Sequence, residues 1–283
     1  MKYGFVLPYG DARTAADFAF EAEQAGWDGF FVWEPIWGWD AWMLLTAAAM
    51  RTEHIKLGTM ITPLSRMRPW ELAGKTVTLD HLSNGRVILA VGLGAVDTGF
   101  AEFGEETERK TRAELLDEGL EILTGLWRGQ PFNYDGKHYR IKPTNFFPPP
   151  PPVQQPRIPI WVVGAWPKQK SLQRALRYDG LLPTVMNDEG QHLPPTPDLI
   201  REMTAYIAAH RTATTPFDIV VEGKTPGADL NRAAEIVRAW ADAGATWWIE
   251  ALWGDPAQSI DLDAVIHRIR QGPPHITRKG ETT

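Results

Sequence analysis

The sequence predicts a single (β/α)8 TIM barrel, and three observations lead to this fold class. First, residues 55–94 read as a strand, a helix and a second strand that are joined by short connections. Second, both strands are apolar throughout, as strands are in a parallel sheet that is covered on both faces. Third, eight apolar runs alternate with eight helical patterns over 283 residues, which is the element order and size of such a barrel.

Eight apolar runs predict the strands, at 3–7, 29–33, 55–62, 87–91, 159–164, 179–183, 217–221 and 246–251. Helical patterns follow them, at 11–25, 40–51, 70–82, 109–127, 168–177, 197–210, 229–243 and 256–269. Several ends carry capping residues: Asp40 can cap the second helix, and Gly26 and Gly244 follow two others. The helix at 40–51 is apolar nearly all round, so we expect it to be buried.

Residues 129–159 interrupt this rhythm before the fifth strand. A hairpin is expected around Asp135-Gly136, and an unbroken proline run follows at 148–152. Such a run can be an SH3-type ligand, but within a compact enzyme it is more often a stiff connector. We therefore expect one barrel domain at 1–272 with an insertion at 129–159 that can pack against a second subunit in a homodimer, and a frayed polar tail at 273–283.

Composition narrows the class of partner. The net charge of −6 disfavours nucleic acid and anionic membranes, which require a basic face, so we expect a small-molecule substrate. The absence of cysteine excludes a disulfide framework, a thiolate metal site and a cysteine nucleophile, and no metal site is predicted. The N-terminal apolar stretch is too short for a signal peptide, and the run at 41–50 is about half the length that crosses a bilayer. These features predict a soluble cytoplasmic protein.

The register of the barrel decides which polar residues can take part in chemistry, because barrel enzymes build their sites from loops that follow strands. His54, His81 and His210 all precede strands, so they belong at the opposite end. Only His192, in the loop after the sixth strand, lies where a general acid or base can work. A solvated loop histidine is the alternative interpretation.

The same criterion selects other side chains for the rim of the barrel mouth. Those nearest to the expected substrate are Trp37, Arg66 and Arg68, and Glu34 and Glu222 also follow strands. Tryptophans in such loops can form an aromatic wall for a planar ligand, although many of the 13 tryptophans can equally be core residues.

Two glycine-containing segments are candidates for cofactor contact. Gly92-Leu93-Gly94 lacks the third glycine or alanine of a dinucleotide-binding fingerprint, so it either permits close approach of a ligand or simply ends a strand. Residues 164–168 open a helix beside Lys168 and Lys170, and backbone amides at a helix start favour a phosphate. An ordinary helix start is the alternative for this second segment.

Several linked motifs resemble the bacterial luciferase-like monooxygenase family, which also contains reductases and dehydrogenases that depend on the deazaflavin coenzyme F420. The motifs are GTMITP at 58–63, Arg68-Pro69, TLDHLSNGR at 78–86 and VGLG at 91–94. The resemblance extends to about residue 183 and is weaker beyond it.

This resemblance implies a barrel with FMN or coenzyme F420 lying across its mouth. The family often has a non-proline cis peptide bond beside the ring, which aligns here with Thr59-Met60. Thr62 aligns with a residue that contacts the cofactor, and Gly92 and Gly94 align with positions of close approach. The phosphate loop of the family aligns with Gly164, Ala165 and Trp166.

The sequence also departs from the family pattern. Many deazaflavin enzymes have Asp-His after the second strand, where this chain has Glu34-Pro35, and the sugar-phosphate dehydrogenases have a glutamate where Ala95 stands. Glu34 can take over as an acid or as a polar contact to the cofactor, and a solvated rim carboxylate is the alternative interpretation. Glu34 and His192 are therefore the catalytic candidates. We therefore expect a monooxygenase that uses reduced FMN on a small apolar or aromatic substrate. An F420-dependent reductase or dehydrogenase is the first alternative, and a non-catalytic flavin-binding barrel is the second.

Overall fold

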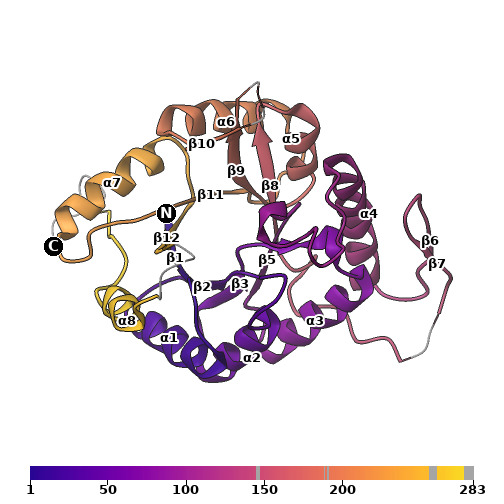
Figure 1. Ribbon diagram of the computed structural model, residues 1–283, viewed down its shortest axis with the longest axis horizontal. Helices are drawn as coiled ribbons and strands as arrows, with labels where there is room; N and C mark the ends of the chain where they lie inside the picture. The colour runs from indigo at the N-terminus through magenta and orange to yellow at the C-terminus, as the bar shows by residue number, and fades with distance from the viewer. Residues whose placement is uncertain (145–146, 188, 190, 255–259, 277–283) are drawn as a thin grey trace.

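A computed structural model shows a closed barrel of eight parallel strands inside a ring of helices (Figure 1). The structure describes residues 1–144, 147–187, 189, 191–254 and 260–276. The barrel strands are β1 (Lys2–Leu7), β2 (Gly29–Val32), β3 (Lys56–Thr59), β5 (Val87–Gly92), β8 (Ile160–Trp166), β9 (Gly180–Met186), β11 (Asp218–Gly223) and β12 (Trp247–Ala251). Pairing of β12 with β1 closes the barrel, which confirms the predicted fold class.

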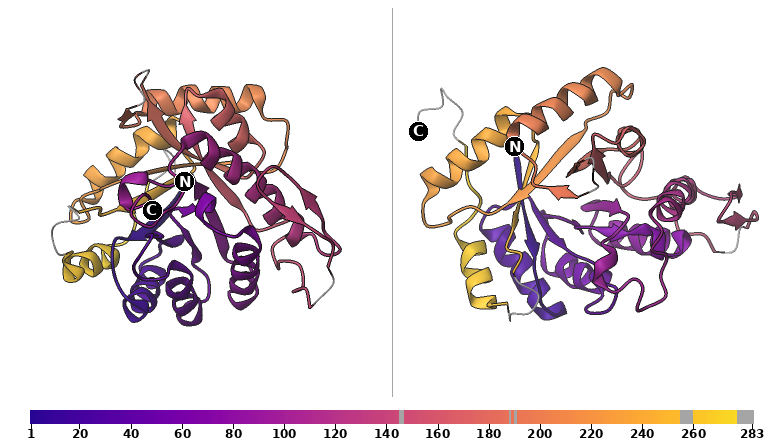
Figure 2. Two further views of the ribbon diagram at one scale, coloured as in Figure 1. Left: turned by 45° about the vertical axis from the view of Figure 1, so that its right-hand side comes forward. Right: turned by 45° about the horizontal axis from the view of Figure 1, so that its top comes forward.

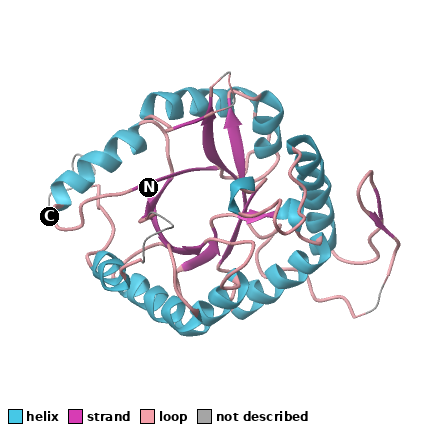
Figure 3. Cartoon of the chain, in the orientation of Figure 1, coloured by secondary structure: helices cyan, strands magenta, loops and turns pink. Residues whose placement is uncertain are grey.

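The helices α1 to α8 cover the outside of the barrel (Figure 3). Their bounds are α1 (Ala12–Gln24), α2 (Ala41–Arg51), α3 (Pro69–Leu82), α4 (Arg109–Trp127), α5 (Gln169–Leu176), α6 (Pro197–His210), α7 (Leu230–Asp242) and α8 (Leu262–Arg270). The predicted start of the last helix is wrong, because the Asp261 side chain accepts hydrogen bonds from the amides of Asp263 and Ala264 and so caps the helix there. Residues 256–259 of that prediction lie outside the described part of the chain.

Several short elements are present in addition to the barrel strands and the surrounding helices. They are β4 (Thr62–Pro63) beside β5, β10 (His192–Leu193) antiparallel to β9, the hairpin β6 (Tyr134–Asp135) and β7 (Arg140–Ile141), and the 3-10 helices η1 (Leu64–Arg66) and η2 (Val96–Thr98). None of the helices within the described residues combines the length and the apolar character needed to cross a bilayer.

The barrel has two apolar layers because side chains alternate along each strand. Inside the barrel, Phe31, Trp161 and Trp247 meet one another, and the ring centroids of the two tryptophans are 5.2 Å apart. A Cβ atom at Gly4 would lie 2.7 Å from the Phe31 ring, so that position leaves space for the ring only as glycine. The alternate side chains fill the larger layer between the strands and the helices.

The insertion before β8 is held to the barrel by acidic side chains. The Glu118 carboxylate on α4 accepts hydrogen bonds from the amides of Lys137, His138 and Tyr139, which fixes the turn between the two strands of the predicted hairpin. The hairpin projects beyond α4 (Figures 1 and 2). After the proline run, the Gln154 side chain donates to Asp80, so the chain is tied to α3 before it enters β8.

The first residues of the C-terminal tail lie against β1. Pro273 and Pro274 are buried, and the Ile276 amide lies 3.3 Å from the Tyr3 hydroxyl oxygen, to which it donates. This part of the expected polar tail is therefore packed against the barrel near the start of β1, where Ile276 contacts the apolar core. Residues 277–283 lie outside the described residues.

Arg86 ties together the end of the barrel opposite the mouth. Its guanidinium is buried and donates to five oxygens, at distances of 2.8–3.0 Å, on Ala49, Thr52, Ile55 and Ser83. These residues belong to the end of α2, the start of β3 and the end of α3. One cation therefore satisfies carbonyl groups that would otherwise be left without donors at the helix ends.

We expect the substitution Arg86→Met to lower the free energy of unfolding by about 3 kcal/mol, because it leaves several buried carbonyl groups without donors. Urea denaturation followed by tryptophan fluorescence measures this loss. Arg201→Met is the matched control, since Arg201 forms only an exposed ion pair with Asp198, and should change stability by less than about 0.5 kcal/mol. Equal losses in the two variants would contradict the anchoring role of Arg86.

Candidate functional site

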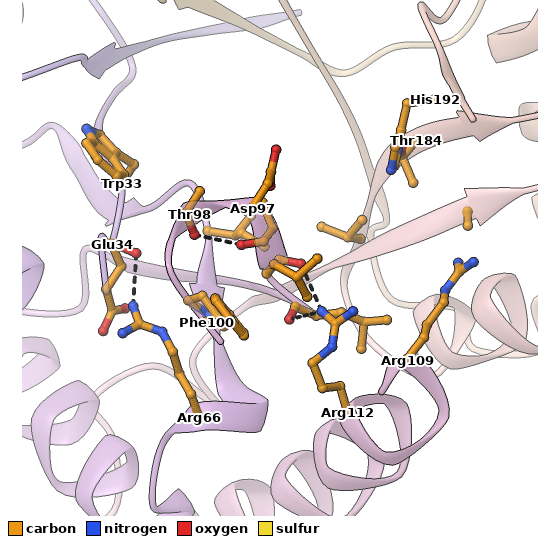
Figure 4. Close-up of a pocket in the computed structure, with 18 of the residues that line it drawn as sticks. Trp33, Glu34, Arg66, Asp97, Thr98, Phe100, Arg109, Arg112, Thr184 and His192 are labelled. Carbon is orange, nitrogen blue, oxygen red and sulfur yellow. Dashed lines mark hydrogen bonds between the residues drawn. The ribbon is translucent and has the colours of Figure 1, made fainter. Parts of the chain in front are cut away.

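A cavity of about 880 Å³ opens at the carboxyl ends of the barrel strands (Figure 4). This is the end at which barrel enzymes place their sites, and the volume suits a ligand of the size of a cofactor. Glu34 and Arg66 lie on one side of the cavity, whereas Arg109, Thr184 and His192 lie on the other. Segments that are more than 150 residues apart in sequence therefore meet at this site.

The floor of the cavity is apolar and is built from the segment that follows β3 and from β8. Met60 and Ile61 lie there with Val163 and Ala165. A cis peptide bond joins Met60 to Ile61, so the predicted position at Thr59-Met60 is wrong by one residue. The reason is that Thr59 still belongs to β3 and pairs with Val32, and the Met60 amide donates to the Val32 carbonyl at 2.8 Å.

Thr59 and Thr62 do not line the cavity but lie behind it. Both side chains are fully buried. Their hydroxyl groups form a chain of hydrogen bonds, in which Thr59 Oγ1 is 3.2 Å from the Ala90 carbonyl oxygen and 3.0 Å from Thr62 Oγ1. Thr62 Oγ1 in turn donates to Glu34 Oε2 at 2.8 Å. In this structure the two threonines therefore support Glu34.

Glu34 lines the cavity and is half-buried. Burial raises the pKa of its carboxyl group above the ordinary value, and the hydrogen bond from Thr62 and the charge of Arg66 only partly oppose this shift. Arg66 Nη2 donates to the main-chain carbonyls of Glu34 and Pro35, at 3.0 and 2.8 Å. Arg66 thus fixes the backbone that carries the acid, and Glu34 retains a proton at higher pH than an exposed glutamate does.

Glu222 is a second cavity acid, from the end of β11. Its side chain is exposed to the open cavity, but the surrounding protein partly desolvates the carboxyl group and raises its pKa, while a hydrogen bond with Trp253 opposes the shift. The sequence places Glu222 on the rim, but it was not among the catalytic candidates. Successive side chains of a strand point to opposite faces, so residues two apart point to the same face. Because Val220 faces the barrel interior, Glu222 is expected to face it as well.

Arg109 and Arg112, in the first turn of α4, bring positive charge to the cavity (Figure 4). Arg112 Nη1 donates to the carbonyls of Leu93 and Gly94, at 2.8 and 3.0 Å, and its guanidinium lies over the Phe100 ring. Sequence reasoning missed both arginines because it considered only loops. The signal was available, since the first turn of a helix that follows a barrel strand lies at the mouth.

These arginines retain capacity to bind an anion. No carboxylate comes within ion-pair distance of Arg66, Arg109 or Arg112 in the described part of the chain. Nε of Arg66 and Nε of Arg112 are buried and have no hydrogen-bond partner among the described residues. A ligand with phosphate or carboxylate oxygens would satisfy such donors.

The predicted phosphate segment begins within β8, whose last three residues, Gly164, Ala165 and Trp166, are divided between the two faces of the strand. Ala165 lines the cavity, but its amide donates to Ser171 Oγ at 3.0 Å. Gly164 and Trp166 point away from it, because alternate residues face the helix layer. A Cβ atom at Gly164 would meet Leu181, and the Trp166 ring lies 5.8 Å from that of Tyr206, edge to face.

The two glycines at the end of β5, Gly92 within the strand and Gly94 beyond it, also differ from each other. Gly94 lines the cavity with a φ of +77°, a conformation that favours glycine. Gly92 lies beneath the floor, where a Cβ atom would meet Ile61 and would lie 2.9 Å from a Val163 methyl group. Ile61 and Val163 therefore occupy the space that the sequence interpretation gave to a ligand.

Lys170 lies in a cationic cleft of about 790 Å³ between α4 and α5. Leu93, Arg109, Ser171 and Arg174 line both this cleft and the main cavity, so the two spaces adjoin. Six cationic and three acidic side chains line the cleft, namely Arg109, Lys110, Lys168, Lys170, Arg174 and Arg177, and Glu108, Glu114 and Asp117. Asp117 already binds Arg174 through two contacts of 2.6 and 2.7 Å.

The remaining candidates take different places. His192 lines the main cavity from β10, and its Nδ1 lies 2.9 Å from Thr184 Oγ1. Arg68 is exposed, lies over the Trp70 ring and does not line the main cavity, because it is the N-cap residue that directly precedes α3. Trp37 lines a separate apolar cavity beside the main one. The described residues contain no group of three or more His, Asp or Glu side chains that could hold a metal ion.

Comparison with known proteins agrees with this architecture. The model of the luciferase-like monooxygenase family matches residues 3–254. An F420-dependent glucose-6-phosphate dehydrogenase of Amycolatopsis mediterranei (strain U-32) is 32% identical over 165 residues, which are 55% of this chain and 48% of that protein. The enzyme of the same name from Mycolicibacterium smegmatis (strain ATCC 700084 / mc(2)155) is 31% identical over 251 residues, or 83% and 71% of the two chains.

A solved structure extends the likeness in fold. An F420-dependent secondary alcohol dehydrogenase in complex with an F420-acetone adduct superposes with a TM-score of 0.75 at 16% identity, over 96% of this chain and 98% of that one. The chain spans about half the length of the first curated relative above. With its matching barrel and the family match over residues 3–254, the chain belongs to the luciferase-like monooxygenase family.

Proposed function

We propose that this protein is an F420-dependent oxidoreductase that transfers a hydride between the deazaflavin and a small-molecule substrate. The observation that carries the proposal is the cationic cleft that adjoins the main cavity. Coenzyme F420 carries glutamyl carboxylates beyond its phosphate, whereas FMN ends at its phosphate. A row of cations that extends past the phosphate region therefore favours F420 over FMN.

The similarity to F420-dependent dehydrogenases over as much as 83% of the chain supports the same choice. It reverses the order expected from the sequence, in which the missing Asp-His pair favoured FMN. That expectation assumed that the acid of the site must be a histidine. The raised pKa of Glu34 offers another proton donor at the same position after β2.

The residues of the cavity fit a deazaflavin cofactor. Met60, Ile61 and Val163 would hold the apolar ring, and Arg109 and Arg112 would hold the phosphate. Lys168 and Lys170 would bind the acidic tail. When bound, the cofactor supplies the hydride donor or acceptor.

Glu34 would supply or accept the proton that accompanies the hydride. Reduction of a carbonyl group adds a hydride to carbon and a proton to oxygen, and oxidation of an alcohol reverses both transfers. The Thr62 hydroxyl has one hydrogen, which it donates to Glu34 when the carboxyl group is ionised. When Glu34 is protonated, it can donate to Thr62, which then donates to Thr59. The threonine pair thus satisfies both protonation states.

A monooxygenase that uses reduced FMN is the second candidate. The departures at Glu34-Pro35 and Ala95 favour it, because these positions lack residues of the deazaflavin dehydrogenases. A non-catalytic cofactor-binding barrel is the third candidate, and it would bind cofactor without turnover with any electron donor.

Fluorescence titration with F420 and with FMN distinguishes these candidates. We expect F420 to bind more tightly, and we expect the double variant Lys168→Ala/Lys170→Ala to weaken F420 binding about 3- to 10-fold while leaving FMN binding nearly unchanged. Arg13→Ala/Arg128→Ala is the control, because it removes two exposed cations elsewhere. Tight binding of FMN alone would favour the monooxygenase, and failure of both cofactors to bind would remove all three candidates.

Glu34→Gln tests the proton donor in a reduction assay with reduced F420. We expect kcat to fall by about 100-fold or more, because an amide cannot donate an acidic proton. In the parent protein, kcat should decline as pH rises through the raised pKa of Glu34, and the variant should lose this decline. Glu102→Gln, at an exposed rim carboxylate, is the control. If Glu222→Gln abolished the decline instead, Glu34 would not be the donor.

The same variant has a consequence for stability that does not depend on activity. A group whose pKa is raised by folding stabilises the protein fully below its unfolded pKa, and this contribution is lost as pH rises through the folded pKa. The stability of the parent relative to Glu34→Gln should therefore decline from about pH 4.5 upward and level off above the raised pKa. Urea unfolding between pH 4 and 8 measures it, and a relative stability that increases with pH would rule out the raised pKa.

A further inference from the structure

We propose that a second, apolar cavity beside the cofactor site binds an uncharged aromatic or alicyclic group of the substrate. This inference rests on the proposed function, because it assigns the substrate class of the same barrel mouth. The cavity measures about 370 Å³ and lies between the ends of β1 and β2 and the first turn of α2. That volume accommodates a group of one or two rings.

The lining of this cavity excludes charge. Its walls are Leu7, Val32, Leu44 and the rings of Tyr9, Trp33, Trp37 and Trp39, with Gly10, Pro35 and Gly38. Asp, Glu, Lys, Arg and His are absent from these lining residues, in contrast to the main cavity with its arginines and glutamates. A phosphate or carboxylate that entered the apolar cavity would lose its hydration without gaining a partner, so charged substrates are disfavoured there.

The apolar cavity adjoins the redox site directly. Trp33 and Pro35 line both cavities, and Glu34 lies between them in sequence and faces the main cavity (Figure 4). The indole nitrogen of Trp33 donates to the Pro8 carbonyl oxygen at 2.7 Å, which fixes the ring that separates the two spaces. A substrate whose reacting carbon lies near Glu34 can therefore extend its apolar part past Trp33 into the second cavity.

Exposed aromatic side chains provide a separate argument. Trp37 is 81% exposed, Tyr9 53% and Trp39 49%, and all three gather around this one cavity. When an apolar ligand covers large exposed rings, apolar surface is removed from water, which is favourable in free energy. Clusters of exposed aromatic residues therefore mark binding surfaces. The two-residue spacing of Trp37 and Trp39 across Gly38 places both rings in one loop.

Sugar phosphates are therefore a poor match to the apolar cavity, although relatives of this chain are F420-dependent glucose-6-phosphate dehydrogenases. The structure assigns this enzyme a neutral substrate with a bulky apolar group attached to a carbonyl or carbinol carbon. In such a molecule only the oxygen at the reacting carbon needs a polar partner, and Glu34 provides it.

Calorimetric titration with 2-naphthol tests the assignment, with naphthalene-2-sulfonate as a charged probe of the same shape. Both probes are added to the protein with and without saturating F420. We expect the neutral probe to bind at least tenfold more tightly than the sulfonate. Trp37→Ala should weaken the binding of 2-naphthol about tenfold. Because the Trp37 side chain is highly exposed, we expect this variant to fold like the parent protein. Trp70→Ala is the matched control, since Trp70 is also exposed but lines neither cavity.

The two proposals fail separately in this experiment. Binding of F420 without binding of 2-naphthol, or equal binding of the two probes when F420 saturates the main cavity, would overturn the apolar substrate site and leave the proposed function standing. Binding of 2-naphthol that Trp37→Ala weakens, in a protein that does not bind F420, would overturn the proposed function alone. Dimerisation that buries the Trp37 loop and blocks 2-naphthol would overturn the substrate site in favour of a second copy of the chain as its occupant.

Discussion

The alternation of side chains along the barrel strands is the constraint on which the site depends. Successive residues point to opposite faces, and in a closed barrel one face is the interior. On β11 the Val220 side chain points into the barrel. Glu222, two residues later, therefore points to the same side and reaches the cavity. On the neighbouring β12 the Glu250 side chain points the other way, toward the helices. It is fully buried there and binds Thr225 and Arg268. Two glutamates near the ends of adjacent strands thus lie in different environments, one in the cavity and the other in a buried ion pair.

This constraint divides the mouth into regions of different polarity. Apolar residues from the segment after β3 and from β8 form the floor, and the first turn of α4 supplies arginines that form no ion pair with a carboxylate among the described residues. Farther out, Asp117 neutralises Arg174 but leaves Lys168 and Lys170 for a ligand. The region beyond Trp33 has no charge at all among its lining residues. A ring, an anion and an apolar group can therefore each find a separate place at one mouth.

Glu34 connects these regions. The carboxyl group stands between the main cavity and the threonine pair, and Arg66 holds its backbone rather than its carboxylate. If Arg66 paired with the carboxylate itself, it would lower the pKa of Glu34 and favour the ionised form. Because the guanidinium binds main-chain carbonyls instead, burial decides the shift and the acid keeps its proton more readily.

The fold class, the order of the strands and helices and the end of the barrel that carries the site can be predicted from the amino-acid sequence, because they follow from local periodicity, caps and strand direction. Glu34, Arg66, His192 and Met60 can be identified in the same way, and all four line the cavity. The orientation of other side chains is visible only in the folded chain, where Thr59, Gly164 and Trp166 face away from the cavity and Arg112 faces it. The direction in which a side chain points depends on how its strand is aligned with the neighbouring strands and on contacts between distant segments, and neither of these leaves a local pattern in the sequence.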